Sequence, residues 1–211
     1  MGVKIGRMVL GMCQTNCYFI YREGCNQVIF IDPADYGEHI YETLKKNGFT
    51  VGAILLTHGH FDHIWGCSKL RALSGAKVYA LKEEEELLLS AQLNSSEAAG
   101  RACTVKVNEL VKDGEILHFF DDLSCKVLAT PGHTVGGCSY YFEEAGFVLC
   151  GDSLFQGSVG RTDLPTGSAS QLIRSIKEKL MVLPEDTIVY PGHGEATTIG
   201  HEKKYNPFLG A

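Results

Sequence analysis

Residues 57–63 of the chain read Thr57-His58-Gly59-His60-Phe61-Asp62-His63. The apolar run at 54–56 comes directly before them, and a short apolar run closed by glycine predicts a buried strand. His58 and His60 are two residues apart, so they do not share one face of a helix, and we expect them in a loop at the end of that strand. Three imidazoles and a carboxylate within six positions predict a metal site.

Three further apolar runs end in the same way. Residues 127–132 lead to His133, residues 148–151 lead to Asp152, and residues 188–192 lead to His193. If these strands share a direction, their carboxyl ends meet at one edge and seven ligand side chains gather there. A tetrahedral zinc ion takes four ligands, so we expect the seven to hold two metal ions.

The seven expected ligands divide into two sets joined by one carboxylate. The first set is His58, His60 and His133, and the second set is Asp62, His63 and His193. Asp152 is expected to bridge the ions together with a hydroxide nucleophile, because paired metals generate hydroxide near neutral pH and act as Lewis acids. Asp62 and Asp152 are the expected catalytic residues, and the expected reaction is hydrolysis of an acyl or phosphoryl bond. Histidine and aspartate ligands suit zinc, which we expect, and also iron or manganese.

Other polar residues are expected to have lesser roles. Asp32 follows a predicted strand and is expected to orient a metal-bound imidazole or to form a turn. The four glutamates at 83–86 point around a predicted helix, so we expect a solvated face rather than a cation site. The eight cysteines include no CxxC pair and are expected to be free thiols that behave as small buried hydrophobic residues. Three histidines without such context are expected to be ordinary surface or core residues: His39, His118 and His201.

Composition and charge restrict the class of protein. A chain of 211 residues is expected to form one domain, 1–211. The net charge of −6 disfavours nucleic acid as a partner, and no apolar stretch is long enough for a membrane span. The amino terminus lacks a signal-peptide pattern, so a cytoplasmic protein is expected. A small-molecule substrate is the expected partner, and the sequence leaves the oligomeric state open, with a monomer plausible.

Strands and helices follow one another without strict βαβ alternation. Strands are predicted at 3–10, 17–21, 27–31, 54–57, 77–81, 103–107, 115–119, 125–130, 138–142, 147–150 and 187–190. Helices are predicted at 37–47, 68–73, 82–92 and 170–180. Residues 156–169 are predicted to form one long loop, and a loop of that length indicates a binding function. This order predicts two packed β-sheets with helices outside them.

Four motifs resemble those of the metallo-β-lactamase superfamily and occur in the same order. They are Thr57-His58-Gly59-His60-Phe61-Asp62-His63, Pro131-Gly132-His133-Thr134, Gly151-Asp152 and Pro191-Gly192-His193-Gly194. The resemblance implies an αββα four-layer sandwich of two mixed β-sheets with helices outside. No cysteine ligand stands in the position of Asp152, which is similar to the glyoxalase II branch. That branch implies a thioesterase (hydroxyacylglutathione hydrolase-like) with a small-molecule thioester substrate such as S-lactoylglutathione.

The same branch implies substrate-binding residues near Asp152. Arg161 stands where these enzymes hold the glutathione moiety with a basic residue, and Phe155 and Asp163 belong to the same stretch. The alternative for Arg161 is a salt bridge to Asp163 that only orders the loop. Full-length glyoxalase II enzymes carry an extra C-terminal helical domain, most of which is missing here. The resemblance therefore points to the short, glyoxalase II-like bacterial hydrolases with relaxed carrier specificity.

Other activities stay open at this point. Gly160-Arg161-Thr162-Asp163 also resembles the persulfide dioxygenases of the superfamily, which use a single iron. The intact motif around His193 favours two metals instead. A nuclease or phosphodiesterase is less favoured because the chain is acidic and shows no RNA-gripping extension. A non-catalytic metal-binding protein is hard to reconcile with a complete ligand set.

Overall fold

Two six-stranded β-sheets form the centre of the molecule. The computed structural model describes residues 2–210. The first sheet contains, in spatial order, β1 (Val3–Leu10), β2 (Thr15–Arg22), β3 (Gln27–Ile31), β4 (Thr50–Leu55), β5 (Lys77–Leu81) and β6 (Glu109–Val111). The second contains β14 (Thr197–Thr198), β13 (Ile188–Pro191), β10 (Phe147–Gly151), β9 (Cys138–Phe142), β8 (Ser124–Ala129) and β7 (Ile116–His118). Each sheet combines parallel and antiparallel pairs, as predicted.

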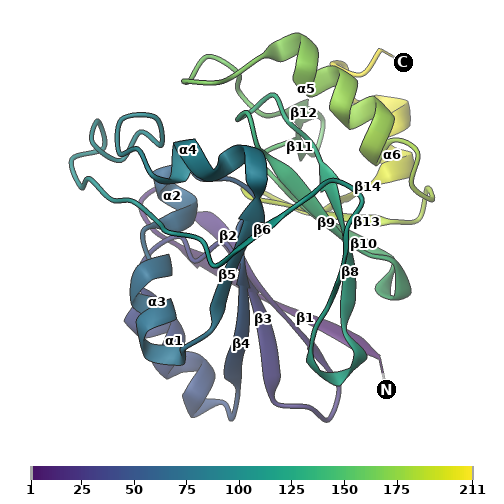
Figure 1. Cartoon of the computed structure of the whole chain (residues 1–211). Coiled ribbons are helices and arrows are strands. Elements are labelled where there is room, and N and C mark those ends of the chain that lie inside the picture. Colours follow the sequence, from purple (N-terminus) through teal and green to yellow (C-terminus); the bar gives the residue numbers. More distant parts are fainter. Residues whose placement is uncertain (1, 211) are drawn as a thin grey trace.

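Helices cover the outer faces of both sheets (Figure 1). The first sheet is covered by α1 (Gly37–Lys46) and α3 (Cys67–Ser74), and the second by α5 (Ala169–Ser175) and α6 (Ile199–Tyr205). Two shorter helices, α2 (Phe61–Ile64) and α4 (Glu85–Leu88), follow β4 and β5. The four layers are the αββα sandwich that the sequence predicts. No helix among residues 2–210 is long and apolar enough to cross a membrane.

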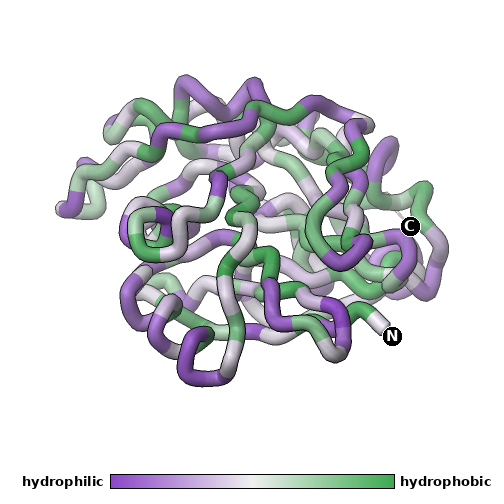
Figure 2. The backbone as a smooth tube through the Cα atoms, turned by 60° about the horizontal axis from the view of Figure 1, so that its bottom comes forward, coloured by the Kyte–Doolittle hydropathy of each residue, from purple (hydrophilic) through white to green (hydrophobic). Residues whose placement is uncertain are grey.

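The central strands are buried on both faces, which explains their continuous apolar sequences. In β3, Val28 and Phe30 pack toward the helices, whereas Ile29 and Ile31 pack between the two sheets. A third apolar cluster lies between the second sheet and α5. Figure 2 shows hydrophilic segments mainly in the outer turns and hydrophobic segments mainly in the interior. These three clusters hold the strand ends in fixed positions.

Several predicted elements differ from the structure. Residues 103–107 form no strand, because the Val105 amide donates to the Leu88 carbonyl and β5 pairs with β6 instead. The helix predicted at 82–92 is a 3-10 turn (Lys82–Glu84) followed by the short α4. The predicted loop 156–169 contains β12 (Ser158–Val159), which pairs with β11 (Leu154–Phe155). The helix predicted at 170–180 is α5 followed by a π-helical turn (Ile176–Leu180), and α6 was not predicted.

Two expectations about individual side chains are also wrong. Glu84 is fully buried, although its neighbours Glu83, Glu85 and Glu86 are exposed, so the run is not uniformly solvated. All eight cysteines are free, as predicted, but only five are buried, and Cys13 is exposed. Both residues lie close to the predicted metal ligands, as described below.

Candidate metal centre

Parallel strand pairs bring most of the predicted ligands to one edge of the molecule. In the first sheet Ile31 of β3 is level with Leu55 of β4, so Asp32 and the motif that starts at Thr57 follow side by side. In the second sheet Gly151 of β10 is level with Pro191 of β13, so Asp152 and His193 also follow side by side. The two sheets therefore present their ligand-bearing ends to each other.

The first predicted ligand set is assembled. The ligand atoms of His58, His60 and His133 all lie within 4.8 Å of one another. Nδ1 of His60 is 2.9 Å from Nε2 of His133. The ring centroids of His58 and His133 are 4.8 Å apart and the rings meet edge to face. All three side chains are buried.

The second predicted set is assembled beside the first. The ligand atoms of Asp62, His63 and His193 also lie within 4.8 Å of one another. Nε2 of His193 is 3.3 Å from Oδ2 of Asp62, and Nε2 of His63 is 3.8 Å from the same oxygen. His63 is fully buried, whereas the His193 side chain is 28% exposed and opens to the cavity. The second set therefore lies nearer the surface than the first.

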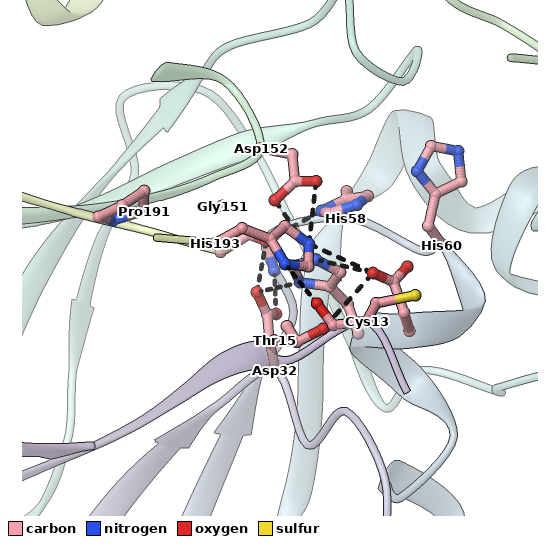
Figure 3. A network of polar contacts seen from close by, with 12 residues as sticks. Cys13, Thr15, Asp32, His58, His60, Gly151, Asp152, Pro191 and His193 are labelled. Carbon is pink, nitrogen blue, oxygen red and sulfur yellow. Dashed lines mark hydrogen bonds and ion pairs between the residues drawn. The ribbon is translucent and has the colours of Figure 1, made fainter. Parts of the chain in front are cut away.

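Asp152 lies between the two sets. Its Oδ1 is 3.4 Å from Nε2 of His63, and its Oδ2 is 3.4 Å from Nε2 of His193 and 3.6 Å from Nε2 of His133. Figure 3 shows Asp152 approaching from one sheet and Asp32 from the other, with His193 between them. Gly192 permits this approach, because a Cβ at that position would collide with Oδ1 of Asp152. A bridging role for Asp152 fits these positions.

Hydrogen bonds fix the tautomers of three histidines. Nδ1 of His63 is 2.9 Å from a carboxylate oxygen of Asp32, Nδ1 of His133 is 2.7 Å from the Arg161 carbonyl, and Nδ1 of His193 is 3.1 Å from the Cys13 carbonyl. Carboxylate and carbonyl oxygens only accept hydrogen bonds, so Nδ1 carries the proton in each ring. In the neutral form of each ring, which is the form that binds metal, the lone pair is then on Nε2, which faces Asp152.

Asp32 also acts on His58 through Thr57. The Thr57 hydroxyl donates to Oδ2 of Asp32 at 2.6 Å, and its oxygen lies 3.1 Å from Nδ1 of His58. Because the hydroxyl proton goes to Asp32, the hydroxyl oxygen accepts a hydrogen bond from Nδ1 of His58. The lone pair of His58 is then on Nε2. Asp32 thus orients one histidine of each set, as carboxylates do for metal-bound imidazoles.

Four buried polar atoms in the cluster have no hydrogen-bond partner among residues 2–210. They are Nε2 of His58, Nε2 of His60, Nε2 of His63 and Oδ1 of Asp152. Buried nitrogen and oxygen atoms are nearly always paired, so unpaired ones require an explanation. Bound cations would satisfy the lone pairs of His58, His63 and Asp152. The residues present therefore fit divalent metal ions, with His58, His60 and His133 around one ion and Asp62, His63 and His193 around another.

Without a metal, the two histidines of the second set are protonated beside Asp62 and Asp152. Burial raises the pKa of Asp152, but His63 and His193 lower it further, to a net value well below the usual range. Burial lowers the pKa of His193, but its hydrogen bonds to Asp152 and Asp62 raise it, to about 9. The pKa of His63 is likewise well above its usual value, because the two carboxylates outweigh the effect of burial. Metal binding must displace the protons of these two histidines.

Two histidines of the first set, His58 and His60, are uncharged at neutral pH. Burial, with a smaller contribution from neighbouring histidines, holds the pKa of His58 well below its usual value. Burial and the nearby His133 lower the pKa of His60 to about 3. Neutral imidazoles are the form that binds metal, so His58 and His60 need no deprotonation at neutral pH.

The predicted substrate residues lie at or near the cavity above the cluster. The cavity has a volume of about 380 Å³ and is lined by Cys13, His60, Phe61, Asp62, His133, Asp152, Phe155, Arg161, Leu164 and His193. The rings of Phe155 and His193 have centroids 6.3 Å apart. Asp163 is not part of the lining. Arg161 forms two hydrogen bonds of 2.7 Å with Asp163, and both side chains are more than 60% exposed.

Sequence reasoning missed three residues that position the second set. The side-chain amide of Asn16 donates to the carbonyls of Pro191 and Gly194, which fixes the loop that carries His193. The Cys13 carbonyl binds that imidazole directly, and the Thr15 hydroxyl lies 3.4 Å from Oδ2 of Asp62. All three belong to the turn and strand that begin β2. In the sequence, these residues stand out only as a short polar stretch between the predicted strands 3–10 and 17–21.

Comparisons with known proteins agree with this geometry. The family model of the metallo-beta-lactamase superfamily matches residues 10–193. The chain belongs to the metallo-β-lactamase superfamily. A relative described as the probable metallo-hydrolase YqgX of Bacillus subtilis (strain 168) is 40% identical over 208 residues, which cover 98% of each chain. Hydroxyacylglutathione hydrolase GloC of Haemophilus influenzae is 36% identical over 202 residues, which cover 93% of each chain.

Solved structures of superfamily members are similar over the whole chain. The structure of BLEG-1 B3 metallo-beta-lactamase has a TM-score of 0.92 and 38% identity, and the match covers 99% of this chain and 100% of that one. A di-iron-bound form of TTHA1623 has a TM-score of 0.85 and 36% identity, with coverage of 97% and 100%. ETHE1 from Myxococcus xanthus has a TM-score of 0.79 and 30% identity, with coverage of 98% and 85%. The superfamily and the histidine–aspartate cluster together support a metallo-hydrolase with a divalent-metal site.

Proposed function

We propose that this protein is a hydrolase of small-molecule thioesters that uses two divalent metal ions, with zinc the expected metal and iron or manganese the alternatives. The observation that carries the proposal is the second set, Asp62, His63 and His193, assembled beside the first with Asp152 between them. A centre with one ion would need only one set. The di-iron-bound form of TTHA1623 supports a pair of ions in a similar chain.

The side chains around the site support acyl transfer to water. When bound, the two ions supply Lewis acidity and lower the pKa of a coordinated water. Asp62 and Asp152 keep their carboxylates ionised, because nearby histidines lower the pKa of each although burial raises it. Each can therefore accept a hydrogen bond from an attacking water and orient it toward the carbonyl carbon.

The cavity supports a substrate with apolar and anionic parts. Phe61, Phe155 and Leu164 offer apolar surface to an acyl group or a thiol carrier. Arg161 is a cation on the cavity wall, and its guanidinium can exchange Asp163 for a carboxylate of the substrate, since arginine binds carboxylates through paired hydrogen bonds. The likeness to GloC makes a glutathione thioester the first substrate to test.

A thioester assay under nitrogen tests this proposal. The metal-loaded protein should release a free thiol from S-lactoylglutathione without consuming oxygen, and the Asp152→Ala variant should not. Oxygen uptake in proportion to added glutathione persulfide, with no thioester cleavage, would favour the alternative of a one-iron dioxygenase, which the likeness to ETHE1 supports weakly. A chromogenic β-lactam belongs in the same assay because of the likeness to BLEG-1.

A further inference from the structure

Glu84 is a buried carboxylate that belongs to neither ligand set. It ends the 3-10 turn after β5 and has no exposed surface, whereas the glutamates on either side of it are exposed. A buried carboxylate is unfavourable unless hydrogen bonds compensate for lost hydration. The partners of Glu84 therefore indicate why this side chain is turned inward.

Both carboxylate oxygens of Glu84 accept a hydrogen bond from the backbone of a ligand loop. Oε1 accepts from the amide of Gly59 at 2.8 Å, and Oε2 accepts from the amide of Gly136 at 2.7 Å. Gly59 stands between the ligands His58 and His60. Gly136 stands three residues after the ligand His133. One side chain thus connects the two loops that supply the whole first set.

The two connected loops come from different sheets. The Gly59 loop follows β4 of the first sheet, and the Gly136 loop follows β8 of the second. At Gly136 a Cβ would collide with the backbone of Glu84 itself, so a glycine is needed for the loop to approach this closely. The backbone at Gly136 is therefore shaped for close contact with the turn that carries Glu84.

We infer that Glu84 is a positioning residue that sets the distance between His133 and the pair His58 and His60, and so holds the first set ready for metal. The inference rests on the proposed metal centre but not on the substrate. The glutamate side chain holds the Gly59 and Gly136 amides at a fixed distance from the 3-10 turn that ends at Glu84. The spacing of the three imidazoles therefore depends on a residue that contacts none of them. Hydrogen-bond partners of this kind commonly influence metal affinity.

The Glu84→Gln substitution tests the inference. A glutamine keeps one acceptor oxygen but directs an amide NH₂ group at the other backbone N–H, which sets donor against donor. Titration with Co²⁺, followed by its absorption spectrum and by competition with a chelator, should show about 10–100-fold weaker binding to the first set. The Co²⁺ spectrum of that set should change, while binding to the second set should keep its wild-type strength.

Glu202→Gln is the matched control. Glu202 is equally buried, and its carboxylate accepts hydrogen bonds from the Gly157 amide, Asn206 and Thr197. None of these partners lies in the loops of the first set. Urea unfolding of both metal-free variants should show comparable losses of stability, but Glu202→Gln should bind Co²⁺ at the first set as the wild type does.

Two results would overturn the inference. One is wild-type Co²⁺ affinity at the first set in Glu84→Gln, and the other is an equal loss in Glu202→Gln. If Glu84→Gln does not fold, amide hydrogen exchange in the metal-free wild type decides. The Gly59 and Gly136 amides should then be strongly protected, and rapid exchange at either would reject the inference. A wild type that binds two ions without cleaving thioesters would refute only the proposed function.

Discussion

The Asp32→Asn substitution should weaken both metal binding and the fold. Asp32 is 2% exposed and accepts hydrogen bonds from the Thr57 amide at 2.8 Å, the Thr57 hydroxyl at 2.6 Å and Nδ1 of His63 at 2.9 Å. An asparagine retains one oxygen for the amide but directs its NH₂ group at the other two partners. His63 must then accept at Nδ1, so its proton moves to Nε2, the atom that faces Asp152.

The structure sets the size of both effects. Two hydrogen bonds to a charged group, about 1.5–3 kcal/mol each, are replaced by neutral ones of about 1 kcal/mol each. The net loss of unfolding free energy is therefore about 1–4 kcal/mol, which lowers the melting temperature by roughly 2–16 °C for a chain of this size. Metal affinity at the set that contains His63 should fall about 10–100-fold.

Chelator competition and calorimetry measure these effects side by side. Zn²⁺ affinity comes from competition with a chromophoric chelator, and stability comes from thermal unfolding of the metal-free protein. Asp35→Asn is the control, because Asp35 is 8% exposed and pairs with Arg101 at 2.8 Å, away from the ligands. Wild-type Zn²⁺ affinity at both sets in Asp32→Asn, or an equal loss in Asp35→Asn, would refute the tautomer argument.

Three other predictions concern the bridge, the cavity wall and the protons. Asp152→Ala should lose bound metal and thioester turnover together, as elemental analysis and the thiol assay would show; near-normal turnover contradicts the bridge. Arg161→Ala should raise KM because a binding contact with the substrate is lost, while the metal content stays unchanged because the backbone carbonyl of residue 161 still accepts the hydrogen bond from His133. Arg161→Lys should restore KM only partly. An unchanged KM in Arg161→Ala would mean that Arg161 serves only to order the loop through its salt bridge to Asp163. His193 has a folded pKa of about 9 and an ordinary value of 6.5, so its contribution to stability is complete below pH 6.5 and is lost as the pH rises through 9. Metal-free protein should therefore unfold at lower urea concentration at pH 9.5 than at pH 7, and no change would show that His193 is neutral at pH 7.

The gathering of the seven predicted ligands follows from local sequence patterns. Each ligand motif directly follows an apolar run that forms a strand. Parallel pairing aligns the end of β4 with that of β3 and the end of β10 with that of β13, and β8 runs in the same direction as β10 because both pair antiparallel with β9. The division into two sets also follows, since His58 and His60 turn toward His133 while Asp62 and His63 turn toward His193. Local patterns were sufficient here because spacing within a short loop determines which side chains can meet.

Residues that act across long sequence separations could not be predicted in this way. Glu84 contacts backbone amides 25 and 52 residues away, and its neighbours in the glutamate run are exposed, so its own burial leaves no pattern. Asn16 reaches the loop of His193 across more than 170 residues. The segment 103–107 alternates like a strand, but the Val105 amide pairs with the carbonyl of Leu88, the last residue of α4, and not with β5. Tertiary packing decided each of these cases.

The metal content of the purified protein tests the central claim most directly. Elemental analysis of wild-type protein, after saturation with Zn²⁺ and removal of free metal, should give two ions per chain. The His193→Ala variant should give one ion per chain and keep its fold, because the first set does not include that imidazole. One ion per chain in the saturated wild type would contradict the two-metal account.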